Sequence, residues 1–254
     1  MYDKVHGTVM QVLEVGLDPG ESVISEIGEF SWMTDTIEIS TGTAGGMGGK
    51  GLLGAVKRVA GGSSFLFNTF AAKGGPGTVS FAAKLPGHIF PIEVQPGADY
   101  LAHRRGFLAG VPGIELSVAL QQSFRGGIFG GEGFLLQRIA GTGRAWIELS
   151  GEVLPYDLQP GQTMRVHPGH VGLFEASVSF QVVRVPGLAN RYLGNDGHHF
   201  VVLTGPGRIW LQSMPLPLLA GALAPYLGGE GHPVESGVAG GAAASVLGSL
   251  FGNR

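Results

Sequence analysis

One strand–turn–strand cassette, in which two apolar runs flank a glycine turn, occurs three times in this 254-residue chain. Its clearest copy lies within residues 130–161. The last turn glycines of the three copies are Gly77, Gly143 and Gly207, so the copies are 66 and 64 residues apart. Self-similarity at a fixed period indicates one supersecondary unit copied along the chain. Apolar runs bounded by glycine turns are typical of strands, so the sequence predicts three β repeats.

Pro-Gly turns recur on the same scale, ending at Gly20, Gly97 and Gly161. Proline presets the φ of the second turn residue and glycine accepts the positive φ that follows, so each pair predicts a type II turn. The first interval is the longer one because a glycine-rich loop intervenes, together with a short helix predicted near residues 52–59. This loop departs from a phosphate-binding loop, since Ala44 stands where the first glycine is needed and Gly51 where Ser or Thr is needed.

Alternation along the second strand of the cassette predicts which face is buried, because successive strand residues point to opposite sides. Two sets of equivalent positions are apolar: Val79, Ala145 and Ile209, and then Phe81, Ile147 and Leu211. We expect these side chains in the core. The position between them is Ser80, Trp146 or Trp210. Exposing two tryptophans would be costly, so we expect this second face to lie against another sheet or another subunit.

Composition fits a folded all-β chain with surface to hide. Glycine is abundant, with 46 residues, but 44% of the chain is hydrophobic and 14 residues are Phe, enough apolar material for a core. Only 14% of residues are charged and the mean hydropathy is +0.24. We therefore expect a homo-oligomer, a trimer or a higher ring. The predicted organisation is one β domain over residues 1–215, followed by a Gly/Ala-rich tail over residues 216–254.

Several partners and compartments are disfavoured by the same numbers. The formal net charge of −3 and the scarcity of adjacent basic residues argue against a nucleic-acid partner. The chain has no cysteine, which removes disulfides and thiolate metal sites. Its first residues resemble neither a secretory signal nor an organelle-import segment, so we expect a cytoplasmic protein. The tail could fray in solution or contact a membrane.

Candidate chemistry is sparse. His167 and His170 flank a Pro-Gly turn and are weak candidates for metal ligands. His198 and His199 are adjacent, so on a strand they would point to opposite faces. The chain has no Gly-x-Ser-x-Gly elbow. Glu132 lies between two glycines, where a turn hydrogen bond is the simplest role. We expect no catalytic residue and no cofactor.

Residues of the cassette are also the candidates for an interaction surface, namely Glu132, Arg144, Trp146, Arg208 and Trp210. The second and third copies carry Gly-Thr-Gly-Arg-Ala-Trp from Gly141 and Gly-Pro-Gly-Arg-Ile-Trp-Leu-Gln-Ser from Gly205. With Gly-Glu-Gly-Phe-Leu from Gly131 and Trp-Met-Thr from Trp32, these segments resemble the mitochondrial biogenesis (altered inheritance of mitochondria) family and its bacterial relatives. The likeness covers most of the chain, from Asp3 to Ser213.

The resemblance implies a fold like that of the tryptophan RNA-binding attenuation protein (TRAP), of the double-stranded β-helix type. It also implies assembly into rings or trimers and no established enzyme activity. RNA binding does not transfer, because the chain has no basic stripe. The expected fold is thus all-β, with three pseudo-repeats of antiparallel strands forming a sandwich or barrel and one short helix in the first repeat.

The expected function is a non-enzymatic, self-associating scaffold or binding protein. Two alternatives stay open. One is a small-molecule or metal-binding β-barrel enzyme, and the other is a peripheral membrane-organising protein that uses its C-terminal tail.

Overall fold

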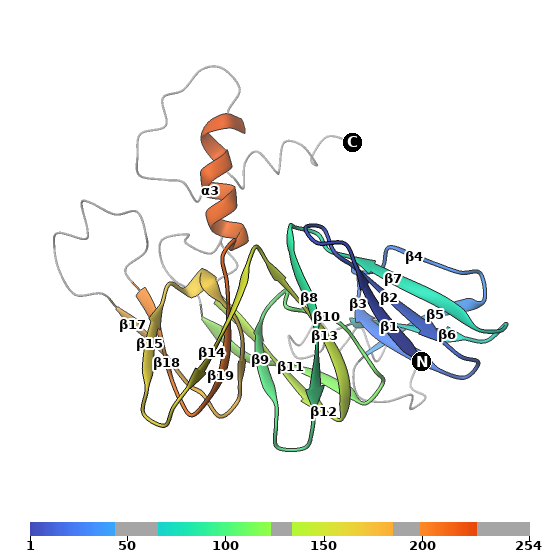
Figure 1. Ribbon diagram of the computed structural model, residues 1–254, viewed down its shortest axis with the longest axis horizontal. Coiled ribbons are helices and arrows are strands. Elements are labelled where there is room, and N and C mark those ends of the chain that lie inside the picture. The colour runs from blue at the N-terminus through green and yellow to red at the C-terminus, as the bar shows by residue number, and fades with distance from the viewer. Residues whose placement is uncertain (44–65, 123–133, 185–198, 228–254) are drawn as a thin grey trace.

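The computed structural model describes residues 1–43, 66–122, 134–184 and 199–227. Within these residues the chain forms a row of antiparallel sheets, with one α-helix rising from the row (Figure 1). The all-β prediction is confirmed, in the form of packed, sandwich-like sheets. The helix predicted near residues 52–59 lies outside the described residues.

The strands of the described residues form four sheets, and the order of the strands in each sheet follows their hydrogen bonding. The first contains β1 (Tyr2–His6), β2 (Val12–Leu17), β7 (Gly77–Ala82) and β4 (Trp32–Met33). The second contains β5 (Ile37–Thr43), β6 (Leu66–Ala72), β3 (Ser22–Glu26), β10 (Phe107–Gly110), β13 (Gly143–Ser150) and β8 (Gly87–Val94). The third contains β11 (Ile114–Gln122), β12 (Phe134–Gly141), β9 (Tyr100–His103), β16 (Val171–Glu175), β19 (Gly207–Gln212) and β14 (Val153–Leu158). The fourth contains β15 (Thr163–Val166), β18 (His199–Thr204) and β17 (Ser179–Arg184).

The same strand pairings recur along the chain in three sets of six consecutive strands, and we call each set a unit. Unit 1 runs from β2 to β7, unit 2 from β8 to β13 and unit 3 from β14 to β19. In each unit the sixth strand pairs with the first and the third, as β7 does with β2 and β4. The fifth strand pairs with the second and the fourth, as β6 does with β3 and β5.

Neighbouring units share a sheet because the third strand of one pairs with the second strand of the unit before it. β10 of unit 2 pairs with β3 of unit 1, where Gly110 faces Ile24. β16 of unit 3 pairs with β9 of unit 2, where Phe174 faces Leu101. The strands that would continue this series are β4 and β15, and each lies at the edge of its sheet. They lie at opposite ends of the row (Figure 1).

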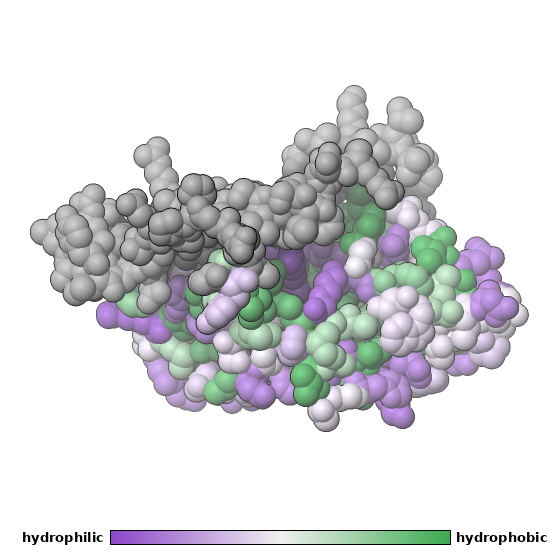
Figure 2. Space-filling view, turned by 90° about the horizontal axis from the view of Figure 1, so that it is seen from above, coloured by the Kyte–Doolittle hydropathy of each residue, from purple (hydrophilic) through white to green (hydrophobic). Residues whose placement is uncertain are grey.

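In the part of the chain that the structure describes, three apolar clusters fill the spaces between successive sheets. The first includes Leu13, Val15, Val23, Phe70 and Phe81, the second Ile92, Phe107, Ile139 and Ile147, and the third Phe174, Val201, Leu203 and Ile209. The predicted core face of the cassette is confirmed at five of its six positions, because Val79, Ala145, Ile209, Phe81 and Ile147 are fully buried. Leu211 is only partly buried and packs against the third cluster. Some apolar side chains nevertheless reach the surface, where they mix with hydrophilic ones (Figure 2).

The Pro-Gly turns have the backbone geometry that the sequence predicts. Gly20, Gly97 and Gly161 have φ values of 89°, 82° and 78°. Glycine is favoured there because a Cβ strains a backbone of positive φ. Each turn leads from the first strand of a unit into the second.

The helix of the described residues, α3 (Leu216–Leu227), was not expected from the sequence. Its prolines suggested an interrupted segment, but Pro217 lies in the first turn, where a missing N–H costs nothing. The segment also contains several Leu and Ala residues, which favour helix. A short 3₁₀ turn, η1 (Pro168–His170), precedes β16. No helix in the described ranges is both long and apolar enough to cross a bilayer. The rest of the predicted tail lies outside those ranges.

Candidate functional site

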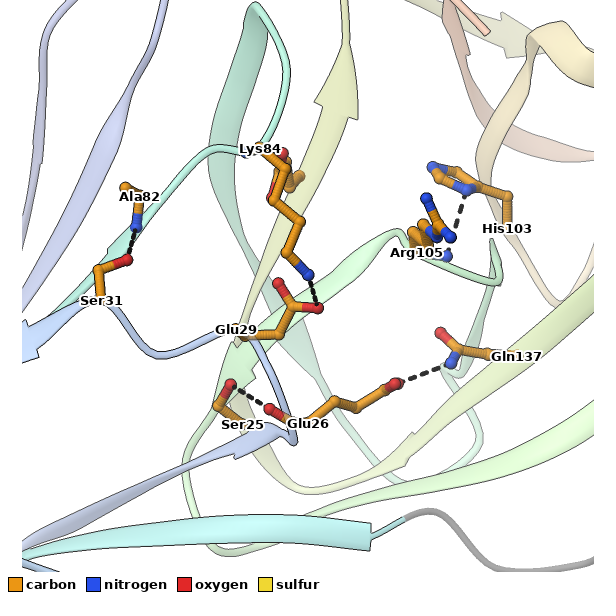
Figure 3. A network of polar contacts seen from close by, with 10 residues as sticks. Ser25, Glu26, Glu29, Ser31, Ala82, Lys84, His103, Arg105 and Gln137 are labelled. Carbon is orange, nitrogen blue, oxygen red and sulfur yellow. Dashed lines mark hydrogen bonds and ion pairs between the residues drawn. The ribbon is translucent and has the colours of Figure 1, made fainter. Parts of the chain in front are cut away.

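A group of polar side chains lies where unit 1 meets unit 2 (Figure 3). It comes from the ends of β3, β9 and β13, the middle of β12, and the connections that follow β3 and β7. Its members are Ser25, Glu26, Glu29, Lys84, His103, Gln137 and Glu148. Polar groups are unusual beside an apolar core unless they are hydrogen-bonded, and most of these side chains have hydrogen-bond partners within the group.

A hydrogen bond between Glu26 and Gln137 joins the second sheet to the third. The Gln137 side-chain amide donates to Glu26 Oε1 at 2.6 Å. Gln137 is fully buried, whereas Glu26 ends β3 at a partly exposed position. The chain leaves the strand just afterwards, at Gly28, whose φ is 93°. The bond therefore clamps the end of β3 onto β12.

Burial gives the Glu26 carboxyl an unusual proton affinity. Loss of solvation raises the pKa of Glu26 to about 7, and the neighbouring charge of Glu29 acts in the same direction. The hydrogen bond from Gln137 opposes this rise because it favours the carboxylate. Near neutral pH, protonated and ionised forms of Glu26 therefore coexist.

His103 is neutral in the same region. Burial lowers the pKa of His103 to about 4, and the charge of Arg105 adds to the effect. Nδ1 of His103 accepts a hydrogen bond from the Arg105 backbone N–H at 3.3 Å, which leaves the ring proton on Nε2. In the described part of the chain, Nε2 of His103 and Oε1 of Gln137 are both buried without a hydrogen-bond partner. Buried polar atoms without a protein partner are commonly hydrogen-bonded to ordered water.

The third part of the cluster fixes the connection between β7 and β8. Lys84 Nζ lies 2.5 Å from Glu29 Oε1, and the Lys84 backbone N–H donates to Glu148 Oε1 at 3.0 Å. Burial raises the pKa of Glu148, while that backbone donor lowers it in part. Lys84 therefore ties the connection after β3 to β13 of the next unit.

This arrangement can hold a proton at Glu26, but it does not pair a nucleophile with a base. The hydroxyl of Ser25 donates to the backbone carbonyl of Glu26 at 3.2 Å and not to its carboxylate. This cluster was not predicted from the sequence. Glu26 follows an apolar run like many solvent-facing strand ends, and Gln137 is one polar residue in a β strand. Neither residue carries a motif that marks it.

Two residues of the predicted interaction surface, Trp146 and Arg144, meet at Asp3. Trp146 is fully buried and packs into the first core cluster, against residues of unit 1. Its indole N–H donates to Asp3 Oδ2 at 3.2 Å. Arg144 lies 2.7 Å from Asp3 Oδ1 and 2.7 Å from Glu93 Oε1. The tryptophan face of β13 therefore lies against another sheet of the same chain.

Trp210 and Arg208 form the corresponding contact one unit further along. The Trp210 ring stacks on Phe90 with centroids 6.3 Å apart and leans on Tyr100 at 6.1 Å. The Arg208 guanidinium lies 5.9 Å from the Trp210 ring centre and 2.5 Å from Asp157. Glu132, the remaining predicted surface residue, lies outside the described residues. An intermolecular role for these residues stays a prediction.

The turn around η1 brings His167 and His170 together, with ring centroids 5.7 Å apart. Nδ1 of His170 lies 2.7 Å from the Gln212 carbonyl oxygen. Across the described ranges, no three or more His, Cys, Asp or Glu side chains form a group suited to a metal ion. The two histidines line a pocket of about 370 Å³, and their proposed role as metal ligands remains a prediction.

The fold and the contacts above define an antiparallel β protein made of serially joined sheets. Residues 3–214 match the family described as mitochondrial biogenesis AIM24, and the chain belongs to this family. A crystal structure of the protein SPYM3_0169 from Streptococcus pyogenes has a similar fold, with a TM-score of 0.70 and 23% sequence identity. The match covers 89% of this chain and 99% of that one. None of the curated proteins matches the chain.

Proposed function

We propose that this protein is a non-enzymatic scaffold or binding protein that associates with copies of itself. In this proposal the chain is three pseudo-repeats of one six-strand unit, with a fold of the TRAP type. The strand pairings that recur in units 1, 2 and 3 support the repeat. The resemblance to ring-forming proteins leads to the same expectation of assembly.

One observation carries the proposal: the row of sheets has an open edge at each end. β4 ends the first sheet and β15 ends the fourth, and within the described residues neither has a strand on its outer side. An exposed strand edge presents unpaired backbone N–H and C=O groups, and proteins commonly cover it. A second copy of the chain would cover both ends.

Surface composition supports the same proposal. The side chains of Trp32, Leu154 and Tyr156 are all exposed near the two open edges. Only 14% of the chain is charged, so few repulsive charges oppose contact between copies.

Sedimentation velocity of the full chain at micromolar concentration tests the proposal. We expect a discrete species of three or more copies, with a mass that does not rise further with concentration once the edges are satisfied. A monomer of 26.3 kDa at every concentration would contradict it.

The buried polar atoms beside Glu26, and separately the pocket lined by His167 and His170, favour a second candidate, a protein that binds a small polar molecule or a metal. Its test combines elemental analysis of the purified protein with a thermal-shift screen of small polar compounds. A stoichiometric metal lost on His167→Ala, or a stabilising compound whose effect is lost on Gln137→Leu, would support this candidate.

Helix α3 favours a third candidate, a peripheral membrane protein. Leu218, Leu223 and Tyr226 are exposed on this uncharged helix, and it projects from the row of sheets (Figure 1). Liposome co-flotation of the full chain and of a chain truncated after Ser213 tests the idea. Equal flotation of the two chains would remove its support.

A further inference from the structure

The contacts between units follow a rule, and this rule predicts how a second copy of the chain would bind. The prediction rests on the self-association proposed above. Each contact has two parts. The third strand of a unit pairs with the second strand of the unit before it, and a tryptophan of the later unit packs into or against the core cluster of the earlier one.

The tryptophan part of the rule is seen twice. Trp146 of unit 2 lies in the first core cluster, which unit 1 mainly supplies. Trp210 of unit 3 lies against the second core cluster, where it contacts Phe90 and Tyr100 of unit 2. Both tryptophans occupy the same position of the sixth strand.

Unit 1 has a serine at this position, and its tryptophan is on the neighbouring strand. Ser80 of β7 faces Trp32 of β4 across the sheet. In the other units the facing pairs are Trp146 with Ala109 and Trp210 with Leu173. Each unit thus has one indole on this pair of positions, and paired residues project from the same face of a sheet. Trp32 is 53% exposed.

Unit 3 has its own counterpart of the sites that Trp146 and Trp210 fill in units 1 and 2. By strand register, Phe90 and Tyr100 of unit 2 correspond to Leu154 and Met164 of unit 3. Leu154 and Met164 line the pocket of about 370 Å³, together with Tyr156. Leu154 is 44% exposed and Tyr156 is 39% exposed. The pocket adjoins the third core cluster, to which Val166 belongs and against which Leu211 packs.

We propose that Trp32 of one copy inserts into this unit 3 pocket of a second copy, while β4 pairs antiparallel with the partner's β15. The register follows from the two contacts within the chain. Gly110 faces Ile24 and Phe174 faces Leu101 at equivalent positions. The next pair in the series is Met33 with Arg165, which places Trp32 opposite Val166.

Charge at the rim agrees with this register. Arg165 and Asp35 are both exposed. With Met33 opposite Arg165, Asp35 lies diagonally across from Arg165, within reach of its long side chain. The register therefore places opposite charges together.

The contact is head-to-tail, because one copy presents unit 1 and the other presents unit 3. The two surfaces lie at opposite ends of the row of sheets, so they cannot form this contact within one copy (Figure 1). Repetition of such a contact closes into a ring when the rotation between copies permits.

Substitution of Trp32 measures the tryptophan part of the contact. Trp32→Ala should raise the dissociation constant of the assembly by about 30-fold or more, as expected for a central aromatic anchor. Tyr226→Ala, which removes an aromatic side chain that is 86% exposed on α3, should leave association unchanged. Equal association constants for wild type and Trp32→Ala would overturn the insertion of Trp32.

Cross-linking measures the strand register directly, since the natural chain has no cysteine. The double variant Met33→Cys with Arg165→Cys, treated with a short bismaleimide, should give covalently linked chains in high yield. The control pair Met33→Cys with Glu115→Cys, both on strands at sheet edges, should not. A species that sediments as an oligomer but gives no Met33–Arg165 cross-link overturns this register and leaves self-association standing. A species that sediments as a monomer removes both.

Discussion

At the scale of single residues, Glu26 shows how position sets chemistry. A glutamate at the end of a strand is ordinarily a solvated carboxylate. In this protein it reaches across to the buried amide of Gln137, and burial raises its pKa to about 7. The protein thus has, between two sheets, a carboxyl group that changes its charge near neutral pH.

Substitution of Glu26 should change how stability depends on pH. The folded-state pKa lies above the unfolded one, so the folded state holds the proton more tightly. The contribution of Glu26 to the free energy of unfolding is therefore fully present below about pH 4.5 and is lost as the pH rises through about 7. Glu26→Gln should remove this loss and raise the free energy of unfolding at pH 8 by about 1–3 kcal/mol.

Urea denaturation between pH 4.5 and pH 8.5 measures this effect, with Glu38→Gln as the control. Glu38 is exposed and pairs with Lys73, so its substitution should change stability by less than about 0.5 kcal/mol. A Glu26→Gln protein that loses stability with rising pH as steeply as the wild type would contradict the assigned burial.

His103 responds in the opposite direction. Its folded-state pKa is depressed to about 4, so the stability it contributes is present above pH 6.5 and is lost as pH falls through about 4. Glu26 and His103 together favour a stability maximum at intermediate pH.

At the scale of elements, β1 distinguishes unit 1 from the others. It pairs with β2 from Tyr2 to His6 and brings Asp3 beside Arg144 and Trp146 of unit 2. Asp3 thus replaces, with a charge-assisted contact, the solvent that Arg144 and the Trp146 indole would otherwise meet. β1 ties the first two units together. The strands that correspond to β2 in the other units, β8 and β14, lie at sheet edges and have no such added strand among the described residues.

Removal of the Asp3 carboxylate should weaken this tie. Asp3→Ala leaves the buried Trp146 N–H without its acceptor, and we expect the free energy of unfolding to fall by about 1–3 kcal/mol. The matched variant Asp157→Ala breaks the exposed pair with Arg208 and should cost less than about 1 kcal/mol. Urea denaturation of both variants at one protein concentration compares them, and equal losses would contradict the special role of Asp3.

Strand periodicity predicted the fold class and the buried face of the cassette. Alternation at Val79 and Phe81 is local information, and local alternation decides which side of a strand is apolar. The sites of contact between units depend instead on pairs distant in sequence, such as Glu26 with Gln137. No local pattern encodes such pairs. Helix α3 was missed for a related reason, since Pro217 breaks a helix in its interior but fits its first turn.

At the scale of the whole molecule, the described residues form a row of sheets in which one kind of junction occurs twice. The two surfaces that would form a further junction are exposed at the two ends of the row. One of these surfaces is β4 with Trp32, and the other is β15 with the pocket beside Met164. In a protein built of units that contact only their neighbours, the outer surfaces of the terminal units must be covered, either by capping or by association.

A structure of the assembled particle tests this account most directly, through the distance from Met33 Cα of one copy to Arg165 Cα of its neighbour. The account predicts about 5 Å, the separation of facing residues in an antiparallel pair, with the Trp32 indole seated beside Leu154 and Met164. An assembly in which these two atoms are more than about 10 Å apart in every contact between copies would contradict it.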